Sequence, residues 1–324
     1  MQITIHQAIL HILDPQAGEP VLSCAPLDLR GSACEYLRAH LEKVAGSDGL
    51  KPCVFGHSAG FLSYLPDLDI RFVENSQKIA RKLFDLMGRY PAIQPGDVAL
   101  LRADIDGQDV LALLKFNYKP CFTHQVTQQG EGLQATVAAA GGVLPTPSQR
   151  VEEAALVDLA EVTVSVLEKP VALDDEKGCY LSGLLLGASP KPSQREKLST
   201  LKKAVEKVDA DFSAAGKGSM QRLASVVLDE EAPPTLEKIG QRLYPNQPQA
   251  QQAFVEKIQA EELAPEDTLV LSEQTAKRIE KQSIKTATGI EVKIPVALYE
   301  QPDAVEFITN PDGTLSLLVK NVVL

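Results

Sequence analysis

The run Gly56-His57-Ser58-Ala59-Gly60 matches the G-x-S-x-G pattern of a serine nucleophile elbow. In that motif the glycines permit a tight turn from strand to helix that exposes the serine. A hydrolase of this kind also needs several βα units before the elbow and a histidine after it, and His124 is the only later histidine. We therefore interpret the run as a glycine-rich turn and keep a serine hydrolase using Ser58 as a remote alternative.

Two cysteine–histidine pairs, Cys53 with His57 and Cys121 with His124, have spacings that would place two metal ligands on one turn each. Neither pair is the usual C-x-x-C knuckle, and buried cysteines with surface histidines explain them more simply. The sequence leaves open whether the two pairs approach each other. The phosphate-binding patterns G-x-x-x-x-G-K-[ST] and G-x-G-x-x-G do not occur. We expect no metal, no other cofactor and no catalytic residue.

Basic side chains gather in two places where they could neutralise phosphate. Residues 191–207 contain six basic and two acidic side chains, and in a helix Arg195, Lys202, Lys203 and Lys207 would lie roughly opposite the apolar stripe of Leu198, Leu201, Val205 and Val208. The second cluster lies on and just after a short helix at 272–281. The candidate DNA-binding residues are Arg195, Lys197, Lys202, Lys203, Lys207, Lys277, Arg278, Lys281 and Lys285. The alternative is a solvated helix face, because Lys202 and Glu206 have the spacing of an ordinary helical ion pair.

The overall charge limits how such clusters could act. The chain of 324 residues has a formal net charge of −11 and a pI of about 5.1, so its average surface repels phosphate and anionic lipid. The surplus of negative charge is concentrated in residues 208–275, where twelve acidic side chains outnumber five basic ones. Trp is absent and aromatic residues make up 5%, which argues against a base-stacking platform. Contact with DNA would be confined to local patches, and we expect it to be weak, non-specific and salt-dependent.

Cysteine usage and hydropathy indicate the compartment. The five cysteines are odd in number and scattered, which is typical of reduced thiols in a cytosol. No basic residue precedes Arg30, and no apolar run approaches the roughly 18 residues that a membrane span needs. We expect a soluble intracellular protein.

Hydrophobic periodicity predicts the elements that would position these residues. Alternation from Ile3 predicts a strand at the N-terminus, and helical spacing predicts helices at about 31–46 and 74–88. The predicted strands of an antiparallel meander are Val98–Leu101, Val110–Tyr118, Phe122–Thr127 and Leu133–Ala139. Near the C-terminus, Ser272 would cap a short helix before a strand at 290–294 and a hairpin around Asn310–Gly313.

These patterns define the fold class as α+β. We predict a mixed N-terminal domain with an antiparallel sheet (1–143), a connecting β-like segment (144–190), a helical middle region (191–262) and a small C-terminal α/β lobe with a hairpin (263–324).

Several short segments, spread in order over nearly the whole chain, resemble one family. They are Ile9-Leu-His-Ile-Leu-Asp14 with Pro20-Val-Leu-Ser23, Gln149-Arg-Val-Glu-Glu-Ala-Ala155, Tyr180-Leu-Ser182, Leu186-Gly-Ala-Ser189, and the C-terminal unit with Gly289-Ile-Glu-Val. Together they resemble the bacterial nucleoid-associated proteins of the NdpA type.

The resemblance implies a cytoplasmic protein of the nucleoid that binds DNA without catalysis. Our leading hypothesis is therefore contact with the phosphate backbone of DNA, most simply double-stranded, through the 191–207 helix and the 277–285 cluster, without strong sequence specificity. The alternative is a protein-interaction adaptor that reaches the nucleoid through a partner, which the acidic region 208–262 would bind. The sequence also leaves open a homodimer, which would double a small basic patch.

Overall fold

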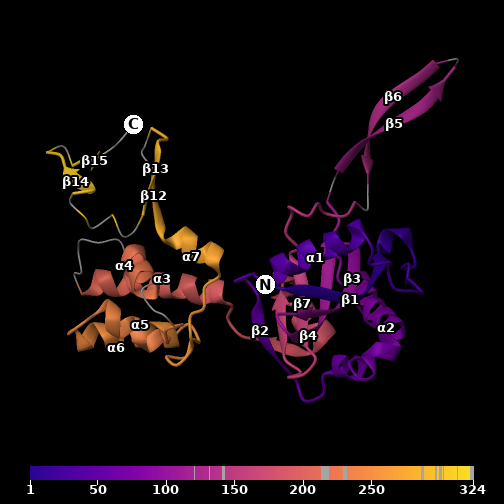
Figure 1. Cartoon of the computed structure of the whole chain (residues 1–324), viewed down its shortest axis with the longest axis horizontal. Coiled ribbons are helices and arrows are strands. Elements are labelled where there is room, and N and C mark those ends of the chain that lie inside the picture. Colours follow the sequence, from indigo (N-terminus) through magenta and orange to yellow (C-terminus); the bar gives the residue numbers. More distant parts are fainter. Residues whose placement is uncertain are drawn as a thin grey trace. The chain divides into compact units, whose positions relative to one another are not determined.

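The computed structural model divides the chain into two compact units, Met1–Lys191 and Pro192–Leu324 (Figure 1). It describes residues 1–119, 121–130, 132–140, 143–212, 219–228, 232–285, 288–295, 298, 301, 303–311 and 313–321, without the side chains of 219–221, 282–285, 309 and 315. Among the described helices, none combines the length and the apolar character that crossing a membrane requires. The α+β class predicted from the sequence is confirmed, whereas its division into four segments stays a prediction.

The first unit is built on a seven-stranded sheet in which every neighbouring pair is antiparallel. In sheet order its strands are β1 (Ile3–Leu13), β3 (Gly96–Ile105), β4 (Gln108–Asn117), β7 (Glu153–Asp158), β8 (Val164–Leu167), β2 (Lys51–Phe55) and β11 (Ala188–Pro190). The tight turn between β3 and β4 uses Asp106 and Gly107, both with positive φ, as a two-residue hairpin turn requires. The alternation at the N-terminus and the pairing of β3 with β4 were both expected.

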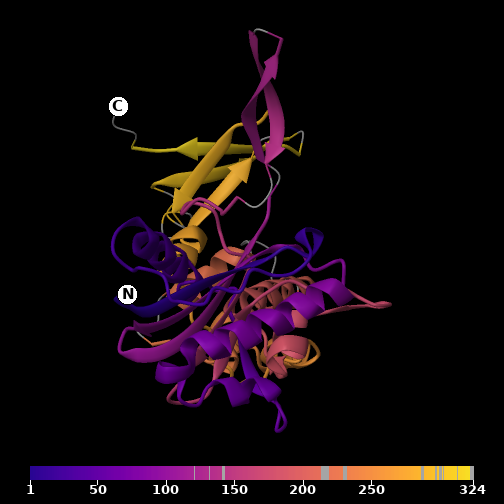
Figure 2. The ribbon, with the colours of Figure 1, turned by 90° about the vertical axis from the view of Figure 1, so that its right-hand side faces the viewer.

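Two helices cover the opposite faces of this sheet (Figure 2). Because side chains alternate along a strand, Leu100 packs in the core that includes α2 (Leu68–Arg89), while Leu101 packs in the core that includes α1 (Ser32–Ala45). Short helical turns lie at η1 (Pro15–Ala17), η2 (Gly60–Tyr64) and η3 (Tyr180–Leu186, a π-helix). The helix expected at 31–46 is α1, and the helix expected at 74–88 begins earlier, because Leu68 and Phe72 are also buried on its inner face.

A buried histidine joins β1 to α2. His11 accepts a hydrogen bond from the Ser23 backbone N–H on Nδ1 (3.1 Å), so its Nε2–H donates to Ser76 Oγ (3.0 Å), which itself donates to the Val73 carbonyl (2.7 Å). Burial lowers the pKa of His11 to about 4, so the ring is neutral at physiological pH and holds these contacts.

The predicted four-stranded meander is wrong for its last two strands, which do not join the main sheet. Strands β5 (Cys121–Gln129) and β6 (Gly132–Ala140) form a separate two-stranded ribbon, and β4 pairs with β7 instead. The reason is that β7 carries the small and apolar residues Ala154 and Ala155 into the core, whereas almost every residue of β5 and β6 is exposed. A second small hairpin joins β9 (Val171–Leu173) to β10 (Glu176–Gly178).

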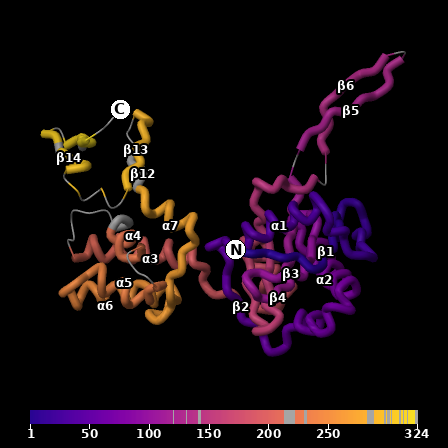
Figure 3. The backbone as a smooth tube through the Cα atoms, viewed as in Figure 1, coloured from indigo at the N-terminus to yellow at the C-terminus, as the bar shows by residue number. Residues whose placement is uncertain are grey.

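The second unit is helical at its start and β-rich at its end (Figure 3). Helices α3 (Gln194–Asp211), α4 (Ser219–Leu228), α5 (Leu236–Leu243) and α6 (Pro248–Gln259) enclose one apolar core that also includes Ile279 of α7 (Glu273–Ile279). The hairpins β12 (Lys281–Lys285) with β13 (Glu291–Pro295) and β14 (Val305–Thr309) with β15 (Leu315–Val319) follow. The short helix α7, the strand β13 and the β14–β15 hairpin were expected from the sequence, whereas β12 was not.

Candidate nucleic-acid interface

Helix α3 is held firmly at its first turn and along one side. Ser193 and Glu196 form a capping box, in which Ser193 Oγ accepts from the Glu196 N–H (3.2 Å) and Glu196 Oε2 accepts from the Ser193 N–H (2.9 Å). The predicted apolar stripe of Leu198, Leu201, Val205 and Val208 is buried, together with Ala204. The opposite side of the helix is therefore fixed in position and turned to solvent.

The exposed side of α3 carries Arg195, Lys202, Lys203 and Lys207, which we call the α3 cation face. Lys202 Nζ lies 3.8 Å from Glu206 Oε1, a weak surface pair between two half-exposed side chains. Within the described part of the chain, Arg195, Lys203 and Lys207 form no salt bridge. Their charges are thus available to an anion.

Lys197 lies apart from the α3 cation face. Its side chain is buried, with Nζ 3.5 Å from Asp267 Oδ1 and donating to the Thr268 carbonyl (3.3 Å). The position follows from the sequence, since residue 197 stands beside Leu198 and four residues before Leu201 on the inner stripe. Lys197 ties α3 to the segment before α7, and we leave it out of the proposed DNA contact.

The second basic cluster lies on α7 and at the start of β12. The Ser272 side chain caps α7 by accepting from the Thr275 N–H (3.3 Å), as expected. Lys277, Arg278 and Lys281 are exposed, and Lys277 Nζ lies 3.6 Å from Glu273 Oε2. Lys285 is in β12, but its side chain lies outside the described residues.

The two clusters belong to the same packed unit. Ile279 of α7 is buried in the same core as Leu198 of α3. The Val270 N–H, just before α7, donates to Gln194 Oε1 at the first residue of α3 (2.9 Å). The chain between 268 and 270 is therefore anchored to the first turn of α3.

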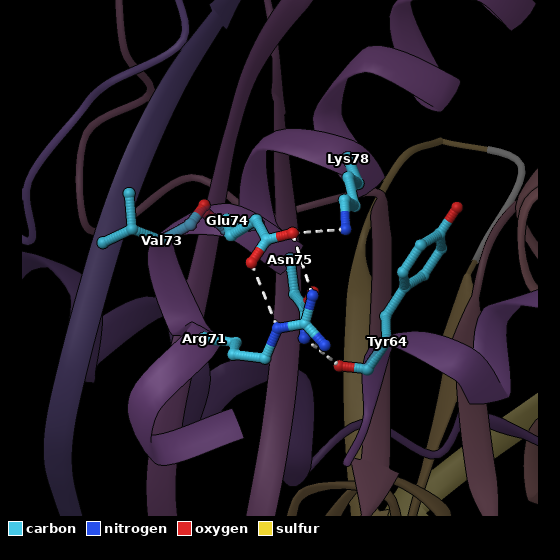
Figure 4. A network of polar contacts seen from close by, with 7 residues as sticks. Tyr64, Arg71, Val73, Glu74, Asn75 and Lys78 are labelled. Carbon is cyan, nitrogen blue, oxygen red and sulfur yellow. Dashed lines mark hydrogen bonds and ion pairs between the residues drawn. The ribbon is translucent and has the colours of Figure 1, made fainter. Parts of the chain in front are cut away.

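Sequence reasoning missed a third group of basic residues, on α2. Here the charges are paired locally, because Glu74 Oε1 lies 3.0 Å from Arg71 Nη2 and 2.6 Å from Lys78 Nζ (Figure 4). These two cations lower the pKa of Glu74 to about 2. Arg81 of the same helix lies 2.8 Å from Glu19. The exposed side of α2 therefore presents matched charges, unlike the α3 cation face.

The G-x-S-x-G run does not have the geometry of a nucleophile elbow. Ser58 is exposed in a turn that leads from β2 into the short 3-10 helix η2, and the neighbours of β2 are antiparallel. Its φ is not positive, whereas an elbow serine sits on a strained turn. The Gly56 N–H donates to the Gly187 carbonyl (2.9 Å), which fits the interpretation as a structural turn.

Within the described residues, the side chains of the two cysteine–histidine pairs are not placed to bind one metal ion together. Cys53 is buried and His57 is exposed. Cys121 and His124 are an odd number of positions apart in β5, so their side chains project from opposite faces of the ribbon. In the part of the chain that the structure describes, no group of three or more His, Cys, Asp or Glu side chains could hold a metal ion.

The first unit also has an apolar pocket of about 720 Å³ beside α1. Leu37, Phe116 and Leu144 are among its walls, and its lining includes Glu35 but no basic residue. A cavity with this lining offers nothing to neutralise phosphate.

The described residues define an α+β protein whose helix α3 presents a face of exposed cations. The family model described as nucleoid-associated protein YejK matches residues 9–323. The chain belongs to this family, which confirms the resemblance seen in the sequence and the predicted localisation in the cytoplasmic nucleoid. No curated protein is significantly similar to the chain.

Proposed function

We propose that this protein binds duplex DNA directly and without catalysis, and that the α3 cation face contacts the phosphate backbone. The observation that carries the proposal is a set of exposed cations, three of them without a salt bridge among the described residues, on a helix whose other side is fully buried. Lys and Arg on one rigid face can neutralise several phosphates without reorganisation of the protein.

The composition of this face argues against sequence-specific reading. Specific readout is served best by planar side chains that make bidentate hydrogen bonds to base edges, such as Arg, Asn and Gln, whereas Lys acts mainly as a flexible point charge that suits phosphate. Within α3 the outward cations are mainly flexible lysines, with Arg195 in the first turn. We therefore infer binding that follows the phosphate backbone, with Lys277, Arg278 and Lys281 as further contacts from the same unit.

The test is fluorescence anisotropy of a labelled duplex titrated with the protein at increasing salt. With three or four phosphates neutralised by α3, we expect log K to fall linearly with log salt concentration, with a slope of about −3 that becomes steeper by about 1 for each further contact from α7 and β12. Scrambling the duplex sequence at constant length should leave the affinity unchanged. Absent binding at low ionic strength, or affinity that does not respond to salt, would contradict the proposal.

The second candidate is an adaptor that reaches the nucleoid through another protein. The acidic surplus of residues 208–275 supports it, because such a region suits a basic protein partner. Nuclease treatment separates the two functions. Direct DNA binding predicts that nucleoid association is lost when the DNA is digested, and an adaptor predicts that it survives.

A further inference from the structure

The β5–β6 ribbon has one apolar and one polar face. In an antiparallel pair, residues directly opposite each other project to the same side. The register pairs Phe122 with Ala139, His124 with Val137, Val126 with Ala135 and Gln128 with Leu133 on one side. The other side pairs Thr123 with Ala138, Gln125 with Thr136 and Thr127 with Gln134. We call the first side, with Phe122, Val126, Leu133 and Val137, the apolar ribbon face.

This face is open to solvent. Phe122, Leu133 and Val137 are each more than 70% exposed and Val126 is 54% exposed. The ribbons of the second unit differ, since β13 buries Ile294 and β14 buries Val305. A two-stranded ribbon without a covered face is only marginally stable in water, and a second layer is the usual remedy. We therefore expect another surface to pack against the apolar ribbon face and shield it from water.

The charge of the ribbon distinguishes between DNA and a second copy of this chain as the partner. Strands β5 and β6 contain no Asp, Glu, Lys or Arg, so the ribbon offers DNA no cation for its phosphates. Two copies of a chain with a net charge of −11 repel each other. This repulsion is weakest when the contact is made by a surface that carries no charge. A second copy also presents an identical apolar face, which a two-fold axis brings into register without further design.

We propose that the apolar ribbon face is a self-association surface on which the ribbon of a second copy of this chain packs face to face about a two-fold axis. The ribbons run antiparallel, so that Leu133 near the tip of one lies toward Phe122 at the base of the other. This orientation places the two acidic chains at opposite ends of the stack. The proposal is independent of the DNA-binding function.

The size of the surface sets the strength of the association. A strand of nine residues extends about 30 Å, and two such ribbons stacked face to face bury on the order of 1,000 Å² in total. Interfaces at this low end of the specific range belong to reversible complexes. The dimer should therefore dissociate on dilution.

The test is analytical ultracentrifugation of the full chain over a range of concentrations. We expect the wild type to pass from monomer to dimer as concentration rises, and the variant Val126→Glu/Val137→Glu to remain a monomer. The matched control is Thr127→Glu/Thr136→Glu, which adds the same charge on the polar side with the same diagonal spacing across the two strands. It should dimerise like the wild type. The milder Val126→Thr/Val137→Thr keeps strand-forming side chains and should weaken the dimer without adding charge.

Three results would overturn the proposal. The first is a wild type that stays monomeric at every concentration, and the second is equal loss of dimer in the apolar-face and control variants. The third is an apolar-face variant that keeps its oligomeric state but loses affinity for DNA, since the ribbon would then be a DNA-inserting arm. Far-UV circular dichroism of each variant should match the wild type, because all the substituted side chains are exposed.

Discussion

The variant Lys203→Glu/Lys207→Glu is expected to bind duplex DNA roughly tenfold or more weakly than the wild type at low salt. Both side chains are exposed on α3 and form no salt bridge among the described residues, so each is free to contact phosphate. Reversal removes two attractive charges and places two repulsive ones in the same positions. Anisotropy with a labelled duplex measures the change, and the salt slope should become shallower by about 2 because two ion contacts are lost.

A matched control separates local contact from net charge. Lys169→Glu/Lys177→Glu makes the same change in total charge at exposed positions of the first unit. We expect this control to keep nearly the wild-type affinity. Equal loss in the two variants would mean that overall charge, and not the α3 cation face, governs binding.

The largest effect on stability is expected at Lys115, a fully buried lysine in β4. Its Nζ donates to Glu153 Oε2 (2.7 Å) and to the Gln94 carbonyl (2.8 Å), and it also contacts Asn117 Oδ1. All three ammonium protons therefore have acceptors. The Tyr180 ring lies 5.9 Å from the same nitrogen. Burial lowers the pKa of Lys115, and the neighbouring carboxylate of Glu153 opposes that shift.

Lys115→Met is expected to destabilise the first unit by about 3–5 kcal/mol, because it leaves the Glu153 carboxylate buried without a counter-charge. Urea denaturation followed by circular dichroism measures the loss. The double variant Lys115→Met/Glu153→Leu removes both charges and should recover most of the stability, since an apolar pair can replace a buried ion pair. A single variant as stable as the wild type, or a double variant less stable than the single one, would contradict this account.

Elements with a strong local period were predictable from the sequence. The stripe from Leu198 to Val208 identified α3 and its inner side, and Ser272 identified the start of α7. The turn chemistry at Asp106 and Gly107 identified the β3–β4 hairpin. In each case the signal lies within about ten residues, so a local reading suffices.

Features that depend on distant partners were not predictable. Strand β4 pairs with β7 rather than β5, because β7 contributes buried residues such as Ala154 and Ala155 to the core and β5 does not. A local sequence pattern does not show which of two distant strands will pair with β4. The partner of Lys197 is Asp267, and that of Arg81 is Glu19, each far away in the sequence. Basic residues were therefore recognisable as a class, but only the folded chain separates exposed cations from paired or buried ones.

Direct contact between α3 and DNA is the central claim, and site-specific photocross-linking tests it most directly. A photoreactive amino acid at position 203 should form a covalent adduct with a labelled duplex, and added salt should abolish the adduct together with binding. The same probe at position 70, where Ile70 of α2 is 89% exposed, should give little adduct. Binding that persists without cross-linking from position 203, or cross-linking as strong from position 70, would contradict the account.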